Sequence, residues 1–230
     1  MKKAIFLTTT TVFLLCSVVM ANADSIYLGN TFNPIYLTGS GLSQPVGGGS
    51  VTPAILNTTT LRYDFCIDLN TDVSVPGTYT AYVTNNGTIN NGTVQVTNAG
   101  EIAYLLHTYA GSTLSTDQQI AIQAAIWHFE NNNVSLNESH YGSTSDVWNY
   151  YSTYITNTGT YSLSDFYWIT PVSQSGAYLQ AQIAPDPSVP EPSTLILLTF
   201  SLIGVAVYTK YKGAHIRQAN QPVSPFLKLV

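Results

Sequence analysis

Between residues 24 and 97 the chain alternates apolar and polar positions with a period of two, which is typical of half-buried strands. Turn signals rich in glycine and asparagine separate these runs, among them Gly47 to Gly49 and Asn85 to Gly87. The predicted strands are Ser25 to Leu28, Ile35 to Thr38, Leu61 to Leu69, Thr78 to Thr84 and Thr93 to Thr97.

The period then changes to that of a helix. Apolar residues at helical spacing before Gly111 are Ile102, Leu105, Leu106 and Tyr109. A second helix is predicted from about Asp117 to Glu130, with Thr116 and Gln119 spaced as a capping box at its start. A third helix is indicated over residues 145–154, and strand character returns at 165–170 and 177–183. We therefore expect the α+β class: a mostly antiparallel β framework with inserted helices.

The first 23 residues have the features of a secretory signal peptide. Two lysines precede an apolar stretch from Ala4 to Met20, and the small residues Ala21-Asn22-Ala23 form a cleavage site before Asp24. A lipoprotein signal acylated at Cys16 is the alternative, but it needs a small residue where Leu15 stands.

The C-terminal end combines a short motif, an apolar run and a basic stop. Val189, Pro190, Glu191 and Pro192 precede a chargeless stretch that reaches Thr209, and three cations follow by position 217. This stretch is long enough for a minimal membrane span, with the preceding domain outside and the tail in the cytoplasm. A buried core helix is the alternative.

These features resemble the PEP-CTERM sorting signal of Gram-negative bacteria that produce exopolysaccharide. The resemblance implies an exosortase-type protease as a partner, an inner-membrane intermediate before processing, and a cell-surface or extracellular location afterwards. The expected organisation is a signal peptide (1–23), an exported domain (24–185), a Pro-rich linker (186–194), a transmembrane sorting helix (195–209) and a basic tail (210–230).

The composition and charge of the chain argue against some classes of function. Only 8% of the 230 residues are charged, and Arg62 is the one cation against eleven carboxylates between residues 24 and 190. That region contains no lysine. A nucleic-acid partner is excluded because phosphate binding needs clustered cations. The acidic run from Asp68 to Ser74 begins like an EF-hand loop, but Val73 replaces its glycine and Tyr79 its closing glutamate, so neither a metal site nor a cofactor is predicted.

One cysteine, Cys66, remains after removal of the signal peptide. It could be a buried thiol, half of an intermolecular disulfide, or the nucleophile of a hydrolase that pairs with His107, His128 or His140. A fourth interpretation starts from Gln123, a glutamine in the most apolar helix with Trp127 one turn further along the same face. Such a glutamine needs a hydrogen-bonding partner if it is buried.

Two segments resemble the paired motifs of bacterial surface thioester domains. The first is Phe65-Cys66-Ile67, and the second is Ile122-Gln123-Ala124-Ala125-Ile126-Trp127. The resemblance implies that the Cys66 thiol displaces ammonia from the Gln123 carboxamide and leaves an internal thioester. The apolar wall would come from Phe65, Ile67, Ile122, Ile126 and Trp127, and His128 and Glu130 are candidates for a proton relay.

The preferred hypothesis is therefore an adhesin-like protein that attaches covalently to an amine-bearing surface or matrix target. It would be a single-use acyl donor and not a turnover enzyme. The alternative is a non-covalent component of an exopolysaccharide matrix, in which aromatic residues between Tyr141 and Tyr154 bind sugar. The third is a secreted cysteine hydrolase.

Overall fold

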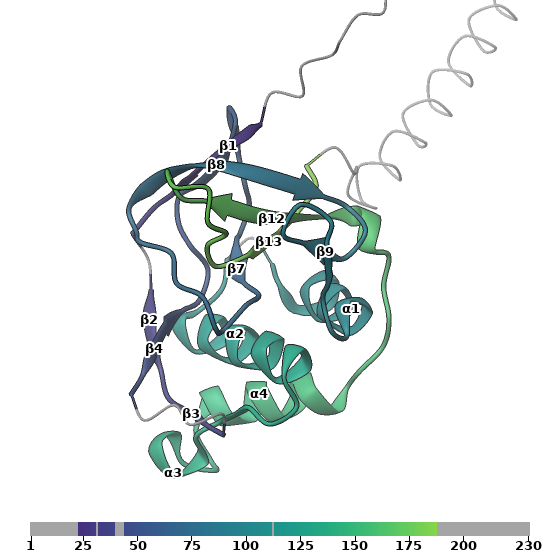
Figure 1. Ribbon diagram of the computed structural model, residues 1–230. Helices are drawn as coiled ribbons and strands as arrows, with labels where there is room; N and C mark the ends of the chain where they lie inside the picture. Colours follow the sequence, from purple (N-terminus) through teal and green to yellow (C-terminus); the bar gives the residue numbers. More distant parts are fainter. Residues whose placement is uncertain (1–22, 31, 40–43, 112, 188–230) are drawn as a thin grey trace, which may run out of the picture.

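The computed structural model describes residues 23–30, 32–39, 44–111 and 113–187 (Figure 1). Residues 1–22 of the predicted signal peptide lie outside this part, as do the predicted sorting motif, transmembrane segment and tail. Within the described ranges, no helix has the length and apolar character needed to span a membrane.

The described chain is mixed α and β, with a curled antiparallel sheet and few helices (Figure 1). Seven strands form the main sheet in the order β6-β5-β1-β8-β12-β13-β7. Their bounds are β1 Asp24–Leu28, β5 Ala54–Leu56, β6 Thr59–Thr60, β7 Phe65–Cys66, β8 Gly77–Thr84, β12 Phe166–Val172 and β13 Gln182–Pro185. The class expected from the sequence is confirmed to this extent.

Three short ribbons complete the β structure. Strand β2 (Asn33–Ile35) pairs with β4 (Val46–Gly48), β3 (Leu37–Thr38) pairs with β11 (Ser135–Leu136), and β9 (Thr88–Ile89) pairs with β10 (Val94–Gln95). The predicted strand Ile35–Thr38 is thus divided between two ribbons. The predicted strand Leu61–Leu69 is wrong in extent, because β7 alone is paired in that segment.

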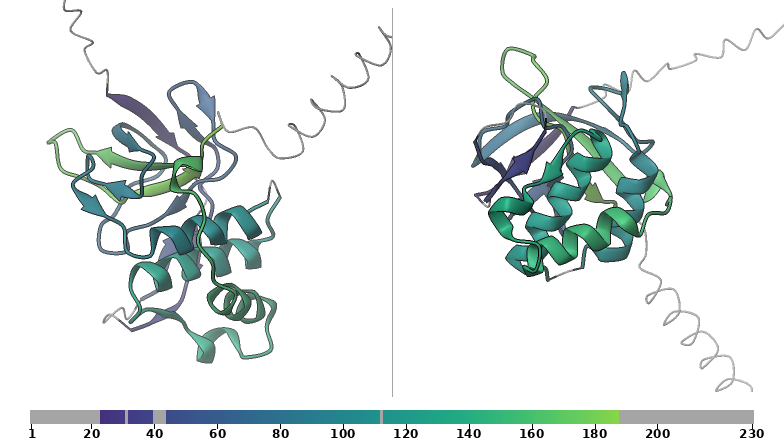
Figure 2. Two further views of the ribbon diagram at one scale, coloured as in Figure 1. Left: turned by 90° about the vertical axis from the view of Figure 1, so that its right-hand side faces the viewer. Right: turned by 90° about the horizontal axis from the view of Figure 1, so that it is seen from below.

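The helices lie together beside the sheet (Figure 2). They are α1 (Ala99–Tyr109), α2 (Thr116–Glu130), α3 (Glu138–Tyr141) and α4 (Asp146–Thr156), and η1 (Leu163–Asp165) is a short 3₁₀ turn before β12. Helix α2 contacts α1, α4, β2, β7 and β11. Because neighbours surround it, α2 is buried on most of its circumference from Ile120 to Phe129, which explains its nearly uniform apolar sequence.

The start of α2 differs by one residue from the sequence prediction. Ser115 is the N-cap, and its side chain accepts a hydrogen bond from the backbone N–H of Gln118 at 3.2 Å. The Gln118 side chain accepts in return from the Ser115 N–H at 3.0 Å. The capping box therefore uses Ser115 and Gln118, and Thr116 is already helical.

Candidate functional site

Cys66 lies on β7, an edge strand of the main sheet. Strand β7 pairs with β13 on one side only, with Cys66 opposite Gln182 and Phe65 opposite Ile183. Ile67 donates its backbone N–H to the Ala181 carbonyl at 2.8 Å. Because backbone groups alternate in direction along an extended chain, the N–H and C=O of Cys66 face away from β13.

The side chain of Gln123 occupies that free edge. Its Nε2 donates to the Cys66 carbonyl at 2.6 Å, and its Oε1 accepts from the Cys66 N–H at 3.0 Å. Both residues are fully buried. The carboxamide therefore pairs with Cys66 as a neighbouring strand would, and it satisfies two backbone groups that would otherwise be buried without partners. Two residues 57 positions apart in the chain are thus in direct contact.

A second backbone donor reaches the same oxygen from the glycine run. The Gly49 N–H donates to Gln123 Oε1 at 3.4 Å. Gly49 has a φ of +105°, a conformation that favours glycine. A Cβ on Gly48 would lie 2.7 Å from Gln123 Cγ and 2.7 Å from the Trp127 ring, so only glycine lets β4 approach α2 so closely. Gln123 Oε1 therefore lies between two N–H donors, those of Cys66 and Gly49.

The five residues of the predicted apolar wall are buried. Its members, Phe65, Ile67, Ile122, Ile126 and Trp127, are all fully buried and belong to the same core cluster as Cys66. The Trp127 ring borders Gly48 on the same side as Gln123. Among the described residues, the Trp127 indole N–H has no hydrogen-bond partner. The Cys66–Gln123 contact is therefore shielded from solvent.

This environment keeps the Cys66 thiol protonated. Burial raises its pKa, the nearby Asp64 and, more weakly, Asp68 add to the effect, and a hydrogen bond with the Gln182 side chain opposes it. The direction is opposite to that of cysteine nucleophiles activated by an imidazolium or a helix N-terminus. Attack by this sulfur therefore requires a group that removes the thiol proton as the bond forms.

Asp64 is the most unusual residue near the sulfur. It is fully buried, and both carboxyl oxygens lack a hydrogen-bond partner among the described residues. Burial raises its pKa well above the usual range, which favours the neutral form of the carboxyl group. Burying even a neutral polar group without partners costs about 1–3 kcal/mol. The Asp64 carboxyl group therefore does not stabilise the fold.

The two predicted relay residues follow Gln123 on α2 but have different surroundings. The His128 ring contacts the Val134 carbonyl at 2.7 Å through Nδ1. Glu130 is seven residues after Gln123 on the same helical face, about 10 Å further along the axis. Burial raises its pKa, with a smaller contribution from Asp68. Neither residue is among the groups that shift the pKa of Cys66.

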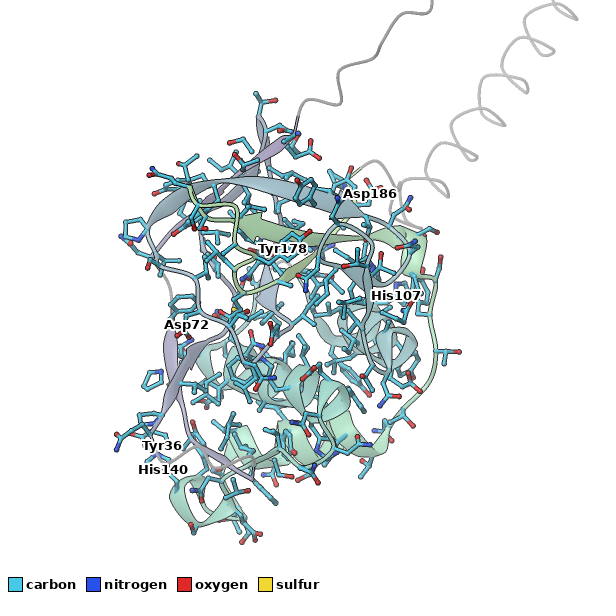
Figure 3. All side chains as sticks on the ribbon, in the orientation of Figure 1. Tyr36, Asp72, His107, His140, Tyr178 and Asp186 are labelled. Carbon is cyan, nitrogen blue, oxygen red and sulfur yellow. The ribbon has the colours of Figure 1, made fainter. Side chains whose placement is uncertain are left out.

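The remaining candidate histidines stack on tyrosines elsewhere. His107 lies against Tyr161 with ring centroids 3.7 Å apart, and His140 lies against Tyr36 at 3.5 Å. Figure 3 shows these two histidines on opposite flanks of the molecule. These positions give no support to a catalytic pair between Cys66 and either His107 or His140.

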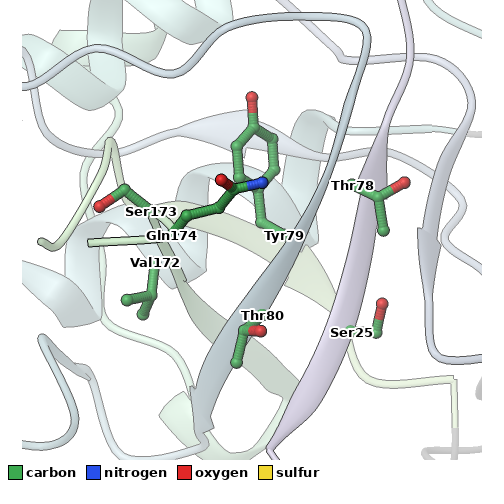
Figure 4. A pocket seen from close by; sticks show the side chains of 7 residues that line it. All are labelled: Ser25, Thr78, Tyr79, Thr80, Val172, Ser173 and Gln174. Atoms are coloured by element: carbon green, nitrogen blue, oxygen red, sulfur yellow. The ribbon is translucent and has the colours of Figure 1, made fainter. Parts of the chain in front are cut away.

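A separate hollow lies on the main sheet, where residues of β1, β8 and β12 line it (Figure 4). Its volume is about 510 Å³, and it is lined by Ser25, Thr78, Tyr79, Thr80, Val172, Ser173 and Gln174. Hydroxyl and amide groups predominate, and none of these lining side chains is an acid or a base of the Asp, Glu, Lys, Arg or His type.

The tyrosine-rich segment is less available than the sequence suggested. Tyr151 and Tyr154 are buried in the main core, and the Tyr141 hydroxyl donates to the Pro34 carbonyl. These rings pack α4 and the neighbouring turn onto the rest of the domain. Tyr151 and Tyr154 are therefore packing residues, whereas Tyr141, Trp148 and Tyr150 are half-buried.

Sequence reasoning missed three parts of the site: Gly49, Asp64 and Gln182. The triple glycine predicts a turn, but a glycine run also permits close backbone approach. Asp64 interrupts an otherwise apolar and aromatic run, which is a signal for a buried carboxyl group. Gln182 gave no signal, because its position opposite Cys66 depends on strand pairing.

Comparison with known proteins adds no relatives. The chain matches no family model, no curated protein and no solved structure.

Proposed function

We propose that this chain is an exported surface protein in which Cys66 and Gln123 form an internal thioester, and that the thioester attaches the protein covalently to an amine-bearing target. The observation that carries the proposal is the direct contact between the two residues. The Gln123 carboxamide is held at both ends by the Cys66 backbone, in a site from which water is excluded.

This arrangement suits the first half of the reaction. An amide is a poor acyl donor, so fixed contact must replace chance encounter between thiol and carboxamide. As sulfur adds to the carboxamide carbon, negative charge develops on Oε1, where the N–H groups of Cys66 and Gly49 already point. Preorganised donors of this kind stabilise the charge at no further cost of reorganisation. Loss of ammonia then leaves the thioester.

The same surroundings protect the product. Water would slowly hydrolyse a thioester, and the apolar wall keeps water away from Cys66 and Gln123. The lack of lysine between residues 24 and 190 means that no internal ε-amine can consume the bond. A target amine that attacks the carbonyl leaves a stable amide at position 123 and a free thiol. Each molecule therefore reacts once, as an adhesin would.

Intact mass measurement tests the proposal. The freshly purified protein should be lighter than its sequence by one ammonia, and methylamine should replace the deficit with an adduct at Gln123. The deficit should vanish in Cys66→Ala and in Gln123→Ala. As a matched control, Gln118→Ala alters a glutamine of the same helix that only caps it, and it should keep the deficit. A folded wild type with the full mass and no adduct would refute the thioester.

Sorting remains part of the proposal. We expect the signal peptide to direct export through the inner membrane, and the segment from Val189 to Pro192 to present a cleavage site to an exosortase-type protease. The mature protein would then be released or transferred to the cell surface. The support is the order of motif, apolar run and basic residues in the sequence.

The hollow on the main sheet favours a second candidate, non-covalent binding of exopolysaccharide. Its hydroxyl and amide groups suit a neutral sugar, and Thr78 and Thr80 project from the exposed face of β8. Thr80→Asp should abolish binding of neutral dextran or cello-oligosaccharides in titration calorimetry. Thr60→Asp, at an equally exposed site on β6, should leave it intact. Equal binding by both variants, or none by wild type, would exclude this candidate.

A further inference from the structure

The thioester reaction needs two proton transfers, and the residues that hold Gln123 supply neither. The backbone N–H groups on Oε1 stabilise charge but do not exchange protons. The Cys66 sulfur begins with its proton, and the departing nitrogen of Gln123 must gain one to leave as ammonia. A single group able to accept one proton and donate another would meet both needs.

The backbone carbonyl of Asp64 lies on the same edge of the chain as the Gln123 carboxamide. The Asp64 carbonyl accepts the Val51 N–H at 2.8 Å, while Gly49, two residues earlier, donates to Gln123 Oε1. The segment from Gly49 to Val51 therefore contacts Gln123 at one end and the backbone of Asp64 at the other. Because Asp64 and Cys66 are two positions apart in extended chain, their side chains share one face. The two groups also interact electrostatically.

We propose that the Asp64 carboxyl group is the proton shuttle of the Cys66–Gln123 reaction. This inference rests on the proposed thioester chemistry. Asp64 satisfies three requirements of such a group: it is fully buried, both of its oxygens are free of hydrogen bonds within the described residues, and its position two residues before Cys66 puts it on the same face as the thiol. A structural carboxyl group would instead be engaged by donors.

The reaction balances with Asp64 unchanged. As the bond from Cys66 Sγ to Gln123 Cδ forms, one Asp64 oxygen takes the thiol proton. The other oxygen gives its proton to Nε2, the Cδ–Nε2 bond breaks, and ammonia leaves. In the second half, a target amine attacks Cδ and loses a proton to Asp64. The carboxyl group then protonates the sulfur as the Cδ–Sγ bond breaks.

Asp64→Asn keeps the shape of the side chain and removes the exchangeable carboxyl proton. Ammonia first opens the thioester to the original thiol and carboxamide, ammonia is then removed, and intact mass follows re-formation with time. Re-formation should slow by about 100-fold or more in the variant. Opening by methylamine should slow by the same factor. The fraction of thioester at a fixed ammonia concentration should not change, because a shuttle accelerates both directions equally.

Asp68→Asn is the matched control. Asp68 lies two residues beyond Cys66, but its carboxylate is engaged by the Asn70 N–H at 2.7 Å and the Thr71 hydroxyl at 2.6 Å. This variant should react at the wild-type rate. Asp64→Ser, which also lacks a carboxyl group, provides a second test if Asp64→Asn fails to fold.

The outcomes separate the two proposals. A wild type that forms the thioester, with Asp64 variants reacting at the same rate in both directions, overturns the shuttle and leaves the proposed function standing. A shift in the fraction of thioester, or slowing in one direction only, indicates a structural role for Asp64 and also overturns the shuttle. A wild type without any mass deficit removes the proposed function and the shuttle together.

Discussion

Replacement of Gly48 by alanine tests the packing that holds Gln123. The new Cβ would lie 2.7 Å from Gln123 Cγ, 2.7 Å from the Trp127 ring and 2.9 Å from Ile35 Cδ1. All three neighbours are in the core, so either β4 or the Gln123 side chain must move. Overpacking of this kind costs typically about 1–3 kcal/mol. Alanine also restricts the backbone of the unfolded chain more than glycine does, which raises the free energy of unfolding by about 0.4–1 kcal/mol.

The expected net effect of Gly48→Ala is a loss of about 1–2 kcal/mol in the free energy of unfolding. The chemical effect should be larger. A displacement of about 1 Å at a reacting group can cost roughly 100-fold in rate, and the clash falls on the carbon chain that carries the Gln123 carboxamide. We therefore expect thioester formation to slow by about 100-fold.

The neighbouring glycine provides the control. A Cβ on Gly47 would meet Phe32 at 3.4 Å, with no closer heavy atom, and would not touch Gln123. Urea unfolding followed by tryptophan fluorescence measures stability in both variants, and intact mass measures the ammonia deficit. If Gly48→Ala matches Gly47→Ala in both assays, the close approach of β4 to Gln123 does not hold the carboxamide in place, and the reasoning is refuted.

Three further predictions concern the buried groups and the proposed sorting motif. Because burial raises the pKa of Asp64 above its unfolded value of 3.8, the folded state holds a proton that the unfolded state has lost. The contribution of Asp64 to the free energy of unfolding should therefore fall by about 1.4 kcal/mol per pH unit from about pH 4 up to its raised pKa in the folded state, and urea midpoints should show that Asp64→Asn lacks this decline. Cys66 is fully buried, so it should resist iodoacetamide in the native protein with or without a thioester, and labelling must be done after denaturation. Protein that is denatured directly should resist alkylation because its sulfur is held in the thioester. Protein that is treated with methylamine and then denatured should be labelled completely. Full labelling of both samples would mean a plain thiol. Replacing Glu191 and Pro192 by alanine should trap a full-length species in the inner membrane, and normal processing on immunoblots of cell fractions would contradict the sorting assignment.

Local sequence was enough to locate the helices. Their apolar spacing and capping residues depend on contacts within four residues, so α1, α2 and α4 appear close to where the pattern places them. Their ends were less certain, because Ser115 and Thr116 can both cap a helix and only the path of the incoming chain decides between them.

The strands were harder to predict because pairing is a long-range event. The run from Leu61 to Leu69 has strand composition throughout, yet only Phe65 and Cys66 are paired as a strand. The outer edge of Cys66 is occupied by the side chain of Gln123 and not by another strand. Short strands such as β4, which is mostly glycine, carry almost no composition signal and form because they fit against α2.

By itself, the sequence determined the residue types at the site: one cysteine between residues 24 and 190 and one glutamine in an apolar helix. Their motifs predicted that the two would meet, but periodicity could not, because nothing local relates positions 57 residues apart. Tertiary structure alone placed Gly49 against the Gln123 oxygen and Asp64 beside the Cys66 thiol. The physical reason is that a buried polar group takes its pKa and its partners from whichever elements pack around it, and those elements come from distant parts of the chain.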